Sequence, residues 1–450
     1  MKDEVLGDIK YQNGAWIREE TIEVYGTNRD ITIEIRANSK NAPLEVQKKA
    51  YSTYLSKKEV YLKQMPQIFL NEYLYNYEDI KSRVEFSEGS PLLRENVSES
   101  IIVKTFAPLV ILFDEKGNYG WICKCGWTKD KTSAILLSES EPRIITPNQL
   151  RNLHKINDNS LNLLVHDGKN AWVGLEQNDF FGKDEDLRIE VEGSAEEGIS
   201  PAQQKAYDEY LEKKENYFNE LTRMMLSVYT GSDEQADQML LTGQKIMVQT
   251  ILPKTLYIDK QGNYGWICYT QWDDSYIGVL LSEKKLYFLS EWNLRNYNKA
   301  EKVIDNVLGL LFSAYGGFEN IIVVRLMDNV RTLRMIINTE EDLKINKEIQ
   351  EAYKTYLKMK PTFWNDIKRQ MLFYYKTYYN DFEENLNIPE ELNKENVNEN
   401  NVISILTFTK LYIDFDGCIA WLCESPTEED GLAFEFTDGK VLWNYQNQII

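Results

Sequence analysis

The stretch that decides the fold is Gly117-Asn118-Tyr119-Gly120-Trp121-Ile122-Cys123, and the same seven letters recur at Gly262–Cys268. A changed third copy stands at Gly417–Cys423. The tryptophans of successive copies are 145 and 155 residues apart: Trp121, Trp266 and Trp421. Self-similarity at a fixed period indicates tandem copies of one structural unit.

A second block recurs in the same order, upstream of the first. It has glutamine, then alanine and tyrosine, and it begins at Gln47, Gln203 and Gln350. A weaker third block pairs Trp16 with Trp172 and with Phe318. Three blocks in one order, three times, predict three homologous domains. We place them at residues 1–152, 153–298 and 299–450.

Each copy reads as an α+β unit. Ile31, Ile33 and Ile35 alternate with polar residues, as in a strand with one buried face. The block at Gln47 has the apolar spacing of an amphipathic helix. Pro66 and Pro361 stand where a second helix would begin, since proline suits a first helical turn. Apolar runs joined by Asp-x-x-Gly close the unit as a hairpin. The pattern predicts an antiparallel sheet with two helices packed on one face.

Composition restricts the class of function. The 450 residues carry a net charge of −20, and the three copies carry −1, −10 and −9. Such a charge disfavours direct binding to nucleic acid or to anionic membranes. No apolar run is long enough to span a bilayer, and no secretion signal is visible. Five cysteines, an odd number, suit a reducing compartment, so we expect a cytoplasmic protein.

Residue types that carry catalysis are scarce. The two histidines, His154 and His166, are not repeated between copies. Cys123 and its counterparts in the other copies lie in apolar strands without a neighbouring base, which is typical of buried structural cysteine. We therefore expect no catalytic residues, no metal and no cofactor, and a protein that is not an enzyme.

The loop after the Trp-Ile/Leu-Cys strand differs in charge between copies. Copy one has Trp127-Thr128-Lys129-Asp130 there. A loop that varies on a constant scaffold is typical of a recognition surface, although a loop without a role also drifts. The residues predicted to bind a partner are Trp127, Trp272, Asp273, Asp274, Glu428, Glu429 and Asp430.

At the Gly-Asn-Tyr-Gly-Trp-Ile-Cys strand, the following Trp272-Asp273 pair and the Gln-x-x-Ala-Tyr helix, the chain resembles a family of uncharacterised bacterial α+β domains. That family is associated with polymorphic-toxin immunity proteins. The histidine that follows the Trp-Asp pair in the family is absent here. The resemblance implies a protein that binds and neutralises a toxin, and an acidic chain suits a basic partner. The alternatives are a multivalent scaffold and a nucleic-acid-mimic inhibitor.

Overall fold

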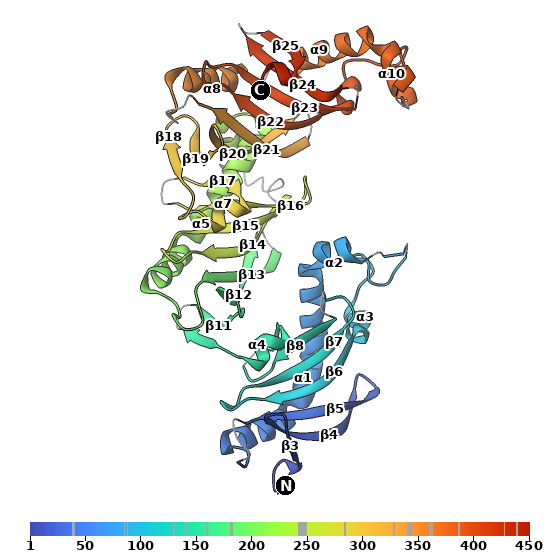
Figure 1. Ribbon diagram of the computed structural model, residues 1–450, viewed down its shortest axis with the longest axis vertical. Coiled ribbons are helices and arrows are strands. Elements are labelled where there is room, and N and C mark those ends of the chain that lie inside the picture. Colours follow the sequence, from blue (N-terminus) through green and yellow to red (C-terminus); the bar gives the residue numbers. More distant parts are fainter. Residues whose placement is uncertain are drawn as a thin grey trace. The chain divides into compact units, whose positions relative to one another are not determined.

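The computed structural model places the chain in two compact units, residues 1–156 with 165–170, and residues 157–164 with 171–450 (Figure 1). The described residues are 1–37, 41–84, 86–87, 89–128, 131–139, 142–158, 161–180, 183–241, 250–282, 285–326, 329–339, 344–359, 363–385, 388–426, 428–437 and 440–450.

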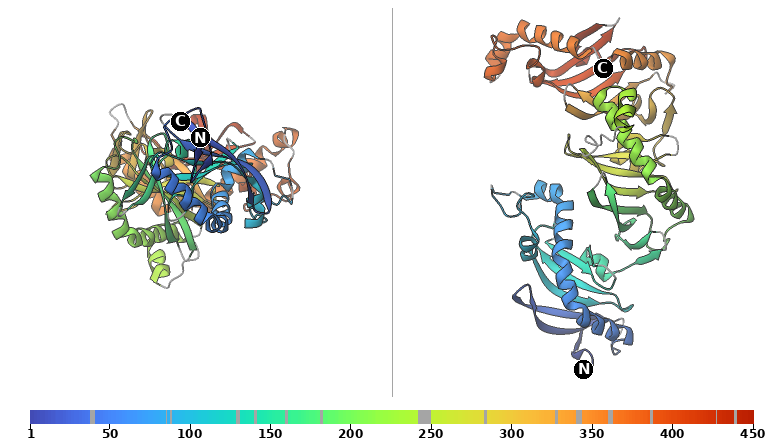
Figure 2. Two further views of the ribbon diagram at one scale, coloured as in Figure 1. Left: turned by 90° about the horizontal axis from the view of Figure 1, so that it is seen from below. Right: turned by 180° about the vertical axis from the view of Figure 1, so that it is seen from behind.

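Three large sheets form the body of the molecule, one in each predicted copy, and each is accompanied by helices (Figures 1 and 2). The sheets have seven, eight and eight strands, in the orders β3 to β9, β10 to β17 and β18 to β25. The α+β class and the tandem organisation are therefore confirmed. The domain boundaries at 152 and 298 stay a prediction.

Copy one contains a short hairpin, a seven-stranded sheet and its helices. Its elements are β1 (Lys2–Asp3), β2 (Gly7–Asp8), β3 (Lys10–Gln12), β4 (Ala15–Val24), β5 (Thr27–Arg36), α1 (Glu45–Tyr75), α2 (Tyr77–Arg83), α3 (Glu99–Ile102), η1 (Val103–Thr105), β6 (Phe106–Phe113), β7 (Tyr119–Cys125), β8 (Thr132–Leu136), β9 (Arg143–Ile145) and α4 (Pro147–Arg151).

Copy two repeats this order. Its elements are β10 (Lys155–Asp158), β11 (Asn162–His166), β12 (Ala171–Phe180), β13 (Lys183–Glu192), α5 (Pro201–Thr230), α6 (Asp233–Leu241), β14 (Ile251–Ile258), β15 (Tyr264–Thr270), β16 (Ser275–Leu280), β17 (Tyr287–Ser290) and α7 (Glu291–Arg295).

Copy three has the same order, with a break in its first long helix. Its elements are β18 (Lys302–Asp305), β19 (Gly309–Ala314), β20 (Gly317–Leu326), β21 (Asn329–Asn338), α8 (Lys347–Met359), α9 (Phe363–Thr377), α10 (Tyr379–Asn385), η3 (Glu390–Leu392), η4 (Val402–Ile405), β22 (Thr407–Ile413), β23 (Ile419–Ser425), β24 (Glu428–Thr437), β25 (Lys440–Tyr445) and η5 (Gln446–Gln448).

The sheets are mixed, whereas the sequence pattern predicts antiparallel ones. In every copy the strand before the long helix pairs in parallel with the strand after it, as β5 does with β6, β13 with β14 and β21 with β22. The helices form a crossover connection between these two strands, which a parallel pair requires. The alternation of apolar and polar residues shows which face of a strand is buried, but it does not show whether neighbouring strands run parallel or antiparallel.

The long helix between the two parallel strands is longer in copies one and two than the sequence predicts. Pro66 lies inside α1 and starts no second helix, and α5 is likewise one helix of 30 residues. A proline in a helix interior loses a backbone hydrogen bond, but Met65 and Phe69 beside it are buried against the sheet. In copy three α8 and α9 are separate, and Pro361 lies outside the described residues.

A repeated glutamine ties the start of each long helix to the sheet in copies one and two. The Gln47 side chain donates to the carbonyl of Arg36 at 2.6 Å, at the end of β5. Gln203 donates to the carbonyl of Glu192 at the end of β13 and also forms a capping box with Ser200. The glutamine of the second sequence block is therefore a structural tether.

The block that decides the fold is structural as well. Gly262 has a φ of +86°, and a Cβ there would lie 2.7 Å from the carbonyl oxygen of Ala202 in the first turn of α5. Trp266 is fully buried on the face covered by α5. Gly265 faces the other side, where a Cβ would lie 2.7 Å from Leu294 of α7. The short helix α7 therefore covers the opposite face, and not every helix packs on one side as predicted.

Candidate functional site

Trp127, the copy-one residue of the predicted binding loop, belongs to the core of its copy. Its side chain is 5% exposed. Its indole Nε1 donates to the Thr105 hydroxyl at 3.1 Å, and its ring meets Tyr73 and Phe106 edge-on. The structure thus gives Trp127 a packing role. Lys129 and Asp130 of this loop lie outside the described residues.

Trp272 and Asp273, in copy two, contact copy three. The Trp272 Nε1 donates to the Thr332 hydroxyl at 2.9 Å, and Asp273 Oδ2 accepts from the Thr332 amide at 2.7 Å. Arg331 donates to the Trp272 carbonyl at 2.8 Å and pairs with Asp273 at 3.3 Å. These groups join two copies of the same chain, and their binding to a separate partner stays a prediction.

Three of the remaining predicted acids, Asp274, Glu428 and Asp430, each contact a neighbour within their own copy. Asp274 has a positive φ of 48° and accepts from the Tyr269 hydroxyl. Glu428 accepts from the Tyr374 hydroxyl, and Asp430 is exposed and accepts from Asn447 at 3.0 Å. Glu429 lies in β24, but its side chain is outside the described set. Partner binding by these four acids also stays a prediction.

The thiols are held in their neutral form. Cys268 and Cys423 are buried, and burial raises the pKa of both well above the ordinary value of a cysteine. Burial also raises the pKa of Cys418 to about 12. A nucleophilic cysteine needs the opposite environment, one that stabilises the thiolate.

Two further findings concern metals and membranes. Across the described ranges, no group of three His, Cys, Asp or Glu side chains is arranged to hold a metal ion. None of the helices described has the length and apolar character needed to cross a membrane.

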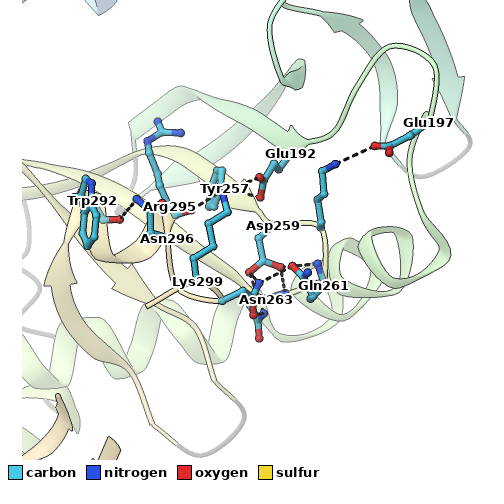
Figure 3. A network of polar contacts seen from close by, with 12 residues as sticks. Glu192, Glu197, Tyr257, Asp259, Gln261, Asn263, Trp292, Arg295, Asn296 and Lys299 are labelled. Atoms are coloured by element: carbon cyan, nitrogen blue, oxygen red, sulfur yellow. Dashed lines mark hydrogen bonds and ion pairs between the residues drawn. The ribbon is translucent and has the colours of Figure 1, made fainter. Parts of the chain in front are cut away.

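An extended polar network lies in copy two, beside α7 (Figure 3). At its centre Asp259 is buried and accepts from the amides of Gln261 and Asn263, both at 2.9 Å, and from the side chains of Asn263 and Asn298. Burial raises the pKa of Asp259 above its ordinary value, although the hydrogen bonds act in the other direction. The Asp259 carboxylate therefore stabilises the turn of the β14–β15 hairpin.

The network continues from the hairpin to α7. The Tyr257 hydroxyl lies 3.1 Å from Glu192 Oε2 and 3.2 Å from the carbonyl of Arg295. Burial raises the pKa of Tyr257, so its hydroxyl is a donor at neutral pH. Arg295 pairs with Glu190 and, at 2.8 Å, with Glu291. Hydrogen bonds and ion pairs therefore join β13 and β14 to the short helix α7 and hold these side chains in place.

Trp292 stands at the edge of this network and points away from the core (Figure 3). Its side chain is 66% exposed, whereas Leu294, two positions later on α7, is fully buried. The Trp292 carbonyl accepts from the Asn296 side chain at 2.9 Å, which fixes the end of the helix. Sequence reasoning missed this residue. The available signal was a tryptophan between two polar residues, two positions after the Ser290 helix cap.

Arg295 has a counterpart in copy one, but Trp292 does not. Arg151 of α4 pairs with Glu34 of β5 at 2.7 Å, as Arg295 pairs with Glu190. The position of Trp292 is taken in copy one by Asn148. The ion pair is therefore repeated in the two copies, whereas the exposed aromatic ring is present in copy two and absent at the corresponding position of copy one.

Searches of family models, of curated proteins and of solved structures returned no match to this chain.

Proposed function

We propose that this chain is a cytoplasmic, non-catalytic protein that binds a basic protein partner, and that the partner is a bacterial toxin which it neutralises. The observation that carries the proposal is the ring of Trp292, 66% exposed and set beside a fixed polar network. Tryptophan is enriched among the residues that dominate binding energy at protein interfaces. An exposed ring on an ordered helix costs little entropy when a partner covers it.

Charge supports the choice of partner. Residues 153–298 carry a net charge of −10, and residues 299–450 carry −9. Opposite potentials speed the encounter of two proteins and help to select the partner. Because copy one has Asn148 where copy two has Trp292, this surface favours one binding site over three equal ones. That argues for an inhibitor and against the multivalent scaffold.

The test is capture of partners from the native host lysate by the tagged full chain, at low and at moderate salt, read by mass spectrometry. We expect one basic protein that is retained by the wild type and released as salt rises. Trp292→Ala should reduce its recovery at least tenfold, because removal of a central aromatic anchor typically costs about 2 kcal/mol or more.

Tyr315→Ala is the matched control, since Tyr315 is another exposed aromatic residue but lies in copy three. It should leave recovery unchanged. Equal recovery by the wild type and Trp292→Ala would exclude Trp292 as the anchor. Capture of nucleic-acid-binding machinery in place of one basic protein would favour the mimic.

A further inference from the structure

An open groove of about 370 Å³ lies on the surface of α9 in copy three. The Phe373 side chain is 65% exposed there, whereas Ile367 and Met371 of the same helix are buried. α9 packs against η4, and the segment before η4 contributes to the groove as well. The described residues that line the groove are Arg369, Leu372, Phe373, Lys376, Thr377 and Glu399. The groove therefore presents an aromatic ring to the outside of this copy.

The hydroxyl groups of two tyrosines show how this helix aligns with its counterpart in copy one. Tyr73 and Tyr375 each donate to a leucine carbonyl in the segment that follows the helix, so the two positions are equivalent. Two positions earlier, Phe373 therefore corresponds to Asn71, and the same spacing in copy two gives Ser227. The exposed ring thus stands where the other copies have a small polar side chain.

Copies one and two use this face of the helix for polar contacts within the chain. In copy one Gln67 donates to the Asn71 side chain at 2.7 Å. In copy two Ser227 donates to Asp233 at 2.5 Å, and Arg223 lies 3.8 Å from the same carboxylate. In both copies the side chains at this position are therefore satisfied by neighbours of the same copy.

Copy three instead places a cation on each side of the ring. Arg369 stands at the position of Gln67 and Arg223, is 63% exposed, and forms a long ion pair of 3.5 Å with Asp366. Lys376 is exposed and has no ion-pair partner among the described residues. α9 holds three cations and one acid, a net charge of +2, although copy three as a whole carries −9. The groove is therefore a basic surface on an acidic copy.

Charge selects the kind of occupant. Opposite potentials favour association, so the two cations favour an anionic ligand. Nucleic acid and anionic membranes present long arrays of negative charge, and these would meet the negative field of the rest of copy three. Glu399 in the lining also limits how many carboxylates the groove accepts. A short acidic segment that also carries an apolar group to cover the ring fits these conditions.

The spacing of the cations describes that segment further. Arg369 and Lys376 are seven positions apart, which is about 10 Å along a helix that rises 1.5 Å per residue. An extended peptide advances about 3.3 Å per residue, so two acids about three positions apart span the same length. Phe373 lies between the two cations, so the apolar residue of the peptide belongs between its acids.

We propose that the α9 groove of copy three binds an extended acidic peptide segment of a partner protein. Its carboxylates pair with Arg369 and Lys376, and an apolar side chain between them covers the ring of Phe373. This site lies on a different copy from Trp292 and does not rest on the proposed function. The chain then recognises two partners of opposite charge, each at a surface of its own.

The test screens the full chain against a displayed library of random decapeptides and reads the enriched sequences. We expect a class of peptides with two acids about three positions apart and an apolar residue between them. A synthetic peptide of this class is labelled with fluorescein, and its binding is measured by fluorescence anisotropy. Replacement of both its acids by glutamine should weaken binding roughly fivefold to tenfold. Added salt should weaken binding in the same direction, because exposed charges are screened.

Two variants carry the residues of copy one at these positions, Phe373→Asn and Arg369→Gln. Phe373→Asn should weaken binding roughly tenfold, because the ring loses its apolar contact, and Arg369→Gln roughly threefold. The matched controls, Leu442→Asn and Arg334→Gln, remove an exposed apolar side chain and an exposed cation elsewhere in copy three; the two side chains are 46% and 55% exposed. Both controls should bind like the wild type, as should Trp292→Ala.

The proposal is overturned if no acidic class of peptides is enriched, or if Phe373→Asn and Arg369→Gln both bind the acidic peptide as tightly as the wild type. Binding of a single-stranded DNA oligonucleotide or of phosphatidylserine vesicles that is lost in Phe373→Asn would also overturn it, since the groove would then recognise phosphate. The comparison of the acidic peptide with its glutamine version uses the wild-type chain, so it decides the matter even where a variant fails to fold.

Discussion

Asp273 allows a quantitative test of how copies two and three are held together. Its Oδ2 accepts from the Thr332 amide at 2.7 Å, and its Oδ1 lies 3.3 Å from Arg331. The pairing of β21 with β22 begins at Arg334, so Asp273 takes the place of a strand partner for the Thr332 amide. A hydrogen bond to a charged group contributes about 1.5–3 kcal/mol, whereas a half-exposed ion pair contributes about 0–1 kcal/mol. Asp273→Ala should therefore cost about 2 kcal/mol at the junction.

Hydrogen exchange at the Thr332 amide measures this cost locally, without requiring the whole chain to unfold in two states. A loss of about 2 kcal/mol corresponds to exchange that is roughly 30-fold faster. Arg331→Ala removes the exposed partner and keeps the carboxylate, so it should speed exchange only a few-fold. The reasoning is refuted if Asp273→Ala leaves the rate within threefold of the wild type, or if Arg331→Ala has the larger effect.

Two further predictions concern the repeated core. Gly262→Ala should destabilise copy two by about 3 kcal/mol in urea denaturation, because its φ is +86° and the new Cβ meets the Ala202 carbonyl at 2.7 Å. Gly231→Ala, with a φ of +71° and open space around it, should cost only about 1 kcal/mol, and equal losses would contradict the contact. The buried hydroxyls of Tyr61 and Tyr119 are 2.7 Å apart, so a double-mutant cycle with phenylalanine should give a coupling of about 1 kcal/mol. Additive losses from the two substitutions would show that the hydroxyls do not interact.

Short sequence patterns predicted the repeated elements of the fold, but they did not predict contacts between residues that are distant in the sequence. The identical blocks at Gly117 and Gly262 predicted the repeated hairpin, and the structure explains them by a tight turn against a helix. The parallel pair of strands in each copy was not predicted, because the alternation of apolar and polar residues is the same for either strand direction. Pro66 was misread because burial of the residues around it outweighs a local preference. The contact of Trp272 with Thr332 joins residues that are 60 apart, and no local pattern reports such a pair.

Where two side chains contact each other in one copy, both positions can differ together in another copy. Tyr217 and Tyr264 repeat the hydroxyl pair of copy one at 2.7 Å. Copy three has Phe363 and Ile419 at these positions, so both hydroxyls are lost together. In copy three the helix α9 is held in place by Tyr375, whose hydroxyl donates to the Leu392 carbonyl. Loss of a single partner would leave a buried hydroxyl unsatisfied, which is costly, whereas loss of both is close to neutral.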